Sequence, residues 1–128
     1  MRFTEYEMTA AVTAAAQSVH PATRRRDEGE KVAAWAALRP MERYRALTAV
    51  GDHILPALVA LPEVEVEAGR RPTFTDEQVR TAVEQSLGNV GWLRRRAMTA
   101  TRASLLKVAL AGLPIRQDPE NFVVPDYL

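Results

Sequence analysis

The chain has 128 residues, of which 47% are hydrophobic and 26% are charged, and its formal net charge is +1. This length suffices for one domain with its own hydrophobic core. The absence of cysteine excludes disulfide frameworks, thiolate zinc sites, iron–sulfur clusters and cysteine nucleophiles. Because the chain has only two histidines, a three-histidine zinc site is excluded as well. We therefore expect neither a metal nor another cofactor.

The sequence also indicates where in the cell the protein is expected to reside. The first residues include acids where an export signal needs a basic stretch followed by an apolar run. The longest apolar run, residues 54–61, is far shorter than the roughly 20 residues that a membrane helix requires. These observations predict a cytoplasmic protein without membrane contact. The bases are almost all arginine and alanine is frequent, a bias typical of a GC-rich bacterial genome.

The first helix is predicted by a capping box. Thr4 is followed three residues later by Glu7, so a helix should begin at Glu5 and end before Pro21. One narrow apolar stripe repeats along it at helical spacing: Met8, Val12, Ala15 and Val19. Residues 20–29 are polar and lack periodicity, which predicts a loop.

Two further helices are predicted on either side of Pro40. A short helix around Val32 and Trp35 should end before Pro40, and Pro40 favours the start of the next helix. The strongest core signal of the chain follows in this third helix: Leu47, Val50, Ile54, Leu58 and Leu61. Pro56 interrupts the pattern, so the helix should kink or break there. We expect Gly51 to permit close approach of the first helix.

An acidic connection and a fourth helix come next. Residues 63–67 alternate glutamate with valine, which predicts an extended connection whose valines lie on the helices. Thr75 and Gln78 form a second capping box, so a fourth helix should begin there and end near Gly88.

The last long helix is predicted over residues 91–113. We expect its buried face to consist of Leu93, Ala97, Ala100, Val108 and Ala111. Its second half is apolar nearly all round, and three leucines lie roughly opposite this face: Leu106, Leu110 and Leu113. Because a large exposed apolar patch is rare on a monomer, these leucines are predicted to form a homodimer interface.

Residues 91–113 also contain five bases and no acid. Arg95 and Arg102 are seven residues apart and share one helix face with Arg94 nearby, and Trp92 is an aromatic anchor beside them. Arginine forks suit phosphates and carboxylates, so this cluster is a candidate site for an anion, an acidic protein partner or nucleic acid. The alternative is a solvated face, or ion pairs with the glutamates of residues 63–67.

These observations predict an all-α fold: a single-domain helical bundle of about five helices over residues 1–128, with one extended acidic connection and an extended tail over residues 114–128. No catalytic or metal-binding residue is predicted, because the chain has no nucleophile elbow and no glycine-rich phosphate loop, and Asp52 and His53 diverge on their helix. We expect a non-enzymatic interaction or regulatory protein that acts as a homodimer. The alternative is a nucleic-acid-binding protein that uses the basic face of the last helix.

Overall fold

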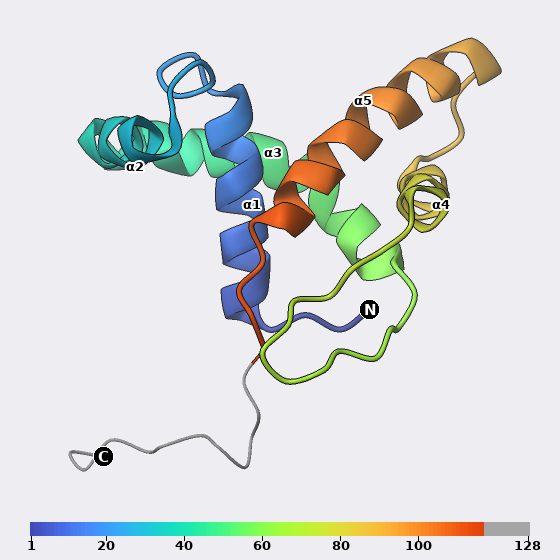
Figure 1. The fold of residues 1–128 in the computed structure, drawn as a ribbon. Coiled ribbons are helices and arrows are strands. Elements are labelled where there is room, and N and C mark those ends of the chain that lie inside the picture. Colours follow the sequence, from blue (N-terminus) through green and yellow to red (C-terminus); the bar gives the residue numbers. More distant parts are fainter. Residues whose placement is uncertain (117–128) are drawn as a thin grey trace.

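Five helices form where the sequence predicts them. The computed structural model describes residues 1–116, and these residues contain no strand, so the all-α fold is confirmed (Figure 1). The helices are α1 (Glu5–Val19), α2 (Glu28–Ala37), α3 (Pro40–Ala60), α4 (Asp76–Ser86) and α5 (Trp92–Ala111). Residues 114–116 continue after α5 without helical structure, and the rest of the predicted tail lies outside the described residues.

Both predicted capping boxes are formed. The Thr4 hydroxyl accepts from the Glu7 amide and the Glu7 carboxylate accepts from the Thr4 amide, each at 3.0 Å. Thr75 and Gln78 make the same reciprocal pair at 3.1 and 2.9 Å. These bonds satisfy amides at the helix start that have no partner within the helix, so they set where α1 and α4 begin.

The core lies where α1, α3, α4 and α5 cross. Alanines on α1 let the neighbouring helices approach closely, and the predicted α3 residues Ile54 and Leu58 are fully buried among them. The predicted apolar side of α4 is buried as well: Val79, Ala82, Val83 and Leu87. Val19 is an exception on α1, because 47% of its surface is exposed.

The predicted orientation of α5 is wrong. Leu106, Leu110 and Leu113 are buried by their own chain, with exposed fractions of 0, 9 and 2%. The residues predicted to be buried are instead exposed: Leu93, Ala97, Ala100, Val108 and Ala111. Both sides of this helix are apolar, and the side with the larger side chains removes more apolar surface from water when it packs. These three leucines therefore belong to the core and cannot form a free dimer interface.

Two residues that weaken helices, Pro56 and Gly51, lie inside α3. The helix continues through Pro56 to Ala60 without a break, and Pro56 itself is exposed. Gly51 is buried and faces α1, as predicted. However, a Cβ placed on Gly51 would lie 3.9 Å from the Val12 side chain, an ordinary contact distance, so close approach does not require glycine there.

The acidic connection runs along the side of the bundle where the N-terminal segment and the segment directly after α5 lie (Figure 1). Val64 and Val66 are half-buried whereas the glutamates beside them are exposed, which confirms the predicted alternation. Gly69 adopts a φ of 81°, a left-handed conformation that glycine accepts without strain. The Gly69 amide donates to the Arg116 carbonyl at 2.7 Å, and the Arg116 amide donates to the Arg70 carbonyl at 2.8 Å. This pairing ties the connection to the segment after α5.

Candidate functional site

One continuous stretch of the chain has no buried side chain. It spans residues 24–49, that is, α2, the loop before it and the first half of α3, and we call it the α2–α3 arm. Val32, Met41 and Tyr44 are 63, 58 and 65% exposed. Figure 1 shows α2 and the start of α3 at one edge of the molecule, away from α4. The arm therefore presents apolar side chains to solvent.

Specific contacts hold this arm in shape. The ring of Trp35 meets the ring of His20 edge-on, with the ring centroids 6.2 Å apart. Arg43 donates to the last carbonyls of α2, including that of Ala36 at 3.1 Å, and it also bonds the carbonyl of Leu38. An arginine at the carboxyl end of a helix satisfies carbonyls that have no amide partner. The angle between α2 and α3 is thus held by Arg43.

The predicted arginine cluster on α5 is divided among three roles. Arg95 donates to the carbonyl of Glu84 at 2.6 Å and to that of Gly88 at 3.4 Å, so it caps the end of α4. Arg102 donates to Nδ1 of His53 at 3.1 Å. Because arginine only donates, Nδ1 of His53 is the acceptor in this bond. Only Arg94 of the predicted set remains exposed without a bond to the described residues.

Trp92 is 72% exposed at the start of α5, as its predicted role as a surface anchor requires. The alternative of ion pairs between the α5 arginines and the glutamates of residues 63–67 is not realised among residues 1–116, because none of these three glutamates pairs with an α5 arginine. Glu63 accepts from the Arg2 amide at 2.8 Å, and Glu67 lies 3.5 Å from Arg70. Both carboxylates therefore have partners outside α5, in the N-terminal segment and at Arg70.

A cavity of about 400 Å³ lies between α4 and α5, and we call it the α4–α5 cavity. It is lined by Arg80, Glu84, Trp92, Arg95, Arg96, Thr99, Ala100 and Ala103. Arg96 belongs to the basic run of residues 91–113 and Thr99 lies between Arg95 and Arg102, but neither they nor Arg80 were among the predicted site residues. Arg80 belongs to another helix, and no pattern within residues 91–113 points to it. A smaller cavity of about 310 Å³ lies beside His53 and Arg102.

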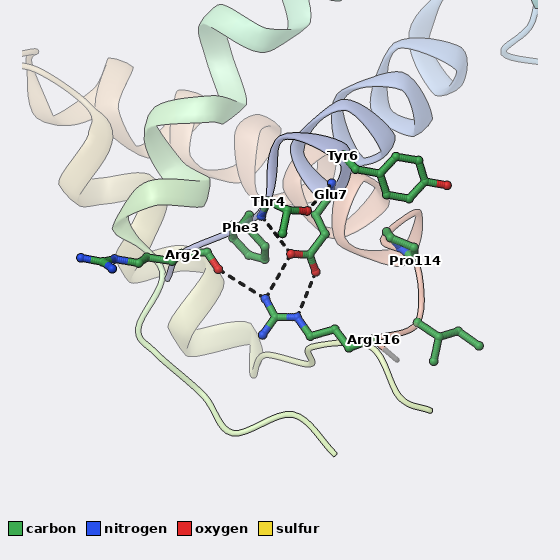
Figure 2. A pocket seen from close by; sticks show the side chains of 8 residues that line it. Arg2, Phe3, Thr4, Tyr6, Glu7, Pro114 and Arg116 are labelled. Carbon is green, nitrogen blue, oxygen red and sulfur yellow. Dashed lines mark hydrogen bonds and ion pairs between the residues drawn. The ribbon is translucent and has the colours of Figure 1, made fainter. Parts of the chain in front are cut away.

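A third cavity, of about 630 Å³, lies where the two ends of the described chain meet. In Figure 2 the Arg116 guanidinium lies between the Glu7 carboxylate and the Arg2 carbonyl. Arg116 Nε donates to Glu7 Oε2 at 3.0 Å, and Glu7 is buried. Burial alone would raise the pKa of Glu7, but the bonds from Arg116 and Thr4 outweigh it and hold that pKa below its ordinary value of 4.5. The charged groups here satisfy each other, which favours a structural role.

Within residues 1–116, no three His, Asp or Glu side chains converge as a group that could hold a metal ion. None of the five described helices combines the length and hydropathy needed to cross a bilayer. A scan against protein-family models and searches of curated proteins and of solved structures found no match to this chain.

Proposed function

We propose that this is a non-enzymatic interaction protein that forms a homodimer through the α2–α3 arm. The observation that carries the proposal is that no side chain of residues 24–49 is buried by the described part of the chain, although Val32, Met41 and Tyr44 are apolar. Trp35, Ala46 and Leu47 pack against the core but are only partly buried, and the exposed apolar side chains of the arm need another surface to cover them. This interface takes the place of the one predicted at the three leucines of α5, because those leucines are buried in the core.

A second copy is the occupant that the size and charge of the arm favour. Stable interfaces involve about 20 to 30 residues on each side, which is the length of the arm. Its charges are partly satisfied internally: Lys31 lies 3.7 Å from Glu28, and Arg43 bonds to carbonyls. Acids and bases are interspersed only over residues 28–49, where four bases accompany three acids, so this part has no strong field of one sign that would select a charged partner. The basic run Arg24, Arg25 and Arg26 lies in the loop before α2. A twofold axis would bring the apolar residues of two identical arms together.

Sedimentation velocity over a range of protein concentrations tests the proposal. The wild type should dimerise as its concentration rises through tens of micromolar. The double variant Met41→Glu, Tyr44→Glu should remain monomeric, because carboxylates would be buried without partners at the interface. Val59→Glu is the matched control, because Val59 lies on the same helix and is 61% exposed but lies outside the arm. A monomeric wild type, or equal dissociation by the control, would contradict the proposal.

A second candidate function, binding an acidic protein partner or nucleic acid, rests on the start of α5. Trp92 is 72% exposed there beside exposed Arg94 and Arg96, and residues 91–113 contain no acid. An aromatic ring beside arginines suits a stacked base or an acidic segment with an apolar anchor. Binding to single-stranded or duplex DNA and to an acidic peptide should then weaken steeply with salt, and Arg94→Gln with Arg96→Gln should reduce that salt dependence. No binding at low salt would exclude this candidate.

A further inference from the structure

We infer that the α4–α5 cavity binds a small organic carboxylate that carries an apolar body, a site independent of the proposed dimerisation. The cavity is lined by residues of α4 and α5, and α4 and the start of α5 lie at the opposite edge of the molecule from α2 (Figure 1). Its volume of about 400 Å³ falls within the range of ligand pockets, about 300 to 1,000 Å³. Such pockets combine a mostly apolar lining with a few polar groups that orient the ligand.

The first of these polar groups is the Thr99 hydroxyl. Thr99 is only 6% exposed, and its Oγ1 is buried without a hydrogen-bond partner among residues 1–116. Two residues further along the same helix, Thr101 shows the usual arrangement, because its hydroxyl donates to the Ala97 carbonyl at 3.2 Å. Burying a hydroxyl without a partner is unfavourable, and a ligand oxygen that accepts from Thr99 would remove that penalty. The unpartnered hydroxyl therefore points to a ligand in this cavity.

The charged groups of the lining determine the class of ligand. Arg80 and Arg96 approach from different helices, and neither side chain bonds to the described residues. An arginine fork binds a carboxylate through two parallel hydrogen bonds. Glu84 also lines the cavity, and its negative charge would oppose a doubly charged phosphate more strongly than a singly charged carboxylate. These charges favour a carboxylate.

The remaining lining determines what carries that carboxylate. Trp92 provides an aromatic wall, and Ala100 and Ala103 provide small apolar surfaces that leave space between the helices. Aromatic rings pack favourably against an indole, and an aliphatic chain loses water contact in the same place. The ligand that fits all these features is an aromatic or aliphatic carboxylate.

Isothermal titration of the full chain with benzoate, octanoate and indole-3-acetate tests this inference, with benzamide as the neutral counterpart and inorganic phosphate as the simple anion. At least one carboxylate should bind saturably. Benzamide and phosphate should bind more weakly than that carboxylate by about tenfold or by a larger factor. Arg96→Gln should weaken binding about tenfold. Arg94→Gln is the matched control, because Arg94 is exposed on the same helix but does not line the cavity.

Thr99→Val gives a second, independent readout, because valine keeps the shape of the side chain and removes only the hydroxyl. Carboxylate binding should weaken about fivefold, while the melting temperature of the ligand-free protein should stay the same or rise, since the unpartnered hydroxyl is gone. The dimerisation variant Met41→Glu, Tyr44→Glu should bind the carboxylate like the wild type. The inference is overturned if no carboxylate binds, if phosphate binds equally well, if Arg94→Gln weakens binding as much as Arg96→Gln, or if Thr99→Val leaves binding unchanged.

Discussion

Gly112, directly after α5, lies so close to Ala14 of α1 that a methyl group on Gly112 would overlap the Ala14 side chain. The backbone of Gly112 has a φ of −87°, which any residue can adopt, so it is the space and not the conformation that requires glycine. This contact sets how closely the first and last helices pack.

Replacing Gly112 should therefore destabilise the fold. Gly112→Ala is expected to lower the free energy of unfolding by about 1 to 3 kcal/mol, because α1 and α5 must move apart. Gly51→Ala is the matched comparison, since its new methyl group would meet Leu55 and Val12 at 3.4 and 3.9 Å. It should raise stability by up to about 1 kcal/mol, the usual gain of alanine over glycine in a helix. Urea denaturation of both variants measures the difference, and equal stability of the two would contradict this account.

The pair between Glu7 and Arg116 should make stability depend on pH. Because the folded protein holds the pKa of Glu7 below 4.5, the ionised carboxylate stabilises the fold above that pH. This contribution should disappear as the pH falls from 4.5 through the folded pKa. Glu7→Gln should cost about 1 to 2 kcal/mol at neutral pH, after allowance for the partial exposure of Arg116.

Glutamine can still form the capping box with Thr4, so Glu7→Gln isolates the ion pair from the helix cap. The readout is the difference in unfolding free energy between the wild type and Glu7→Gln, measured from pH 7 to pH 3. That difference should shrink below pH 4.5. A difference that stays constant over this range would mean that the charge of Glu7 does not stabilise the fold.

Neighbouring arginines on α5 should differ sharply in their effect on stability. Arg95 bonds the carbonyls of Glu84 and Gly88, whereas Arg94 is exposed. Arg95→Ala should lower the free energy of unfolding by about 1 kcal/mol, because the end of α4 loses its cap. Arg94→Ala should change it by less than about 0.5 kcal/mol. Thermal or urea denaturation would contradict the assignment if the two losses were equal.

The α2–α3 arm should be the least protected helical part of the described chain. Helices with few buried side chains open locally at low cost, and α2 has none that is fully buried whereas α1 has five, so the amides of α2 should exchange with solvent much faster than those of α1. If the arm forms the dimer interface, raising the protein concentration should slow exchange in α2 and leave α4 unchanged. Hydrogen exchange measured by NMR at two concentrations gives both values. Fast exchange in α2 at every concentration would argue against the dimer.

Local patterns predicted the helices well because each rests on neighbouring residues. The capping boxes at Thr4 and Thr75 and the stripe through Ile54 and Leu58 depend on spacings that the sequence displays directly. The orientation of α5 was predicted wrongly because both of its faces are apolar, so only the packing of other helices decides which face is buried. Likewise, the partners of Arg95 and Arg102 lie 7 to 49 residues away, and no local pattern encodes those distances.

The close packing of α1 against α5 also has a consequence for how the chain acquires its structure. The first helix leaves the ribosome long before the last, yet it finds its most extensive helical neighbour only when α5 has been made. Contacts between residues this far apart require the intervening chain to close a long loop, which slows folding relative to bundles of sequential helices. Until translation reaches the end of α5, Ala14 on α1 lacks the Gly112 backbone that packs against it in the finished fold.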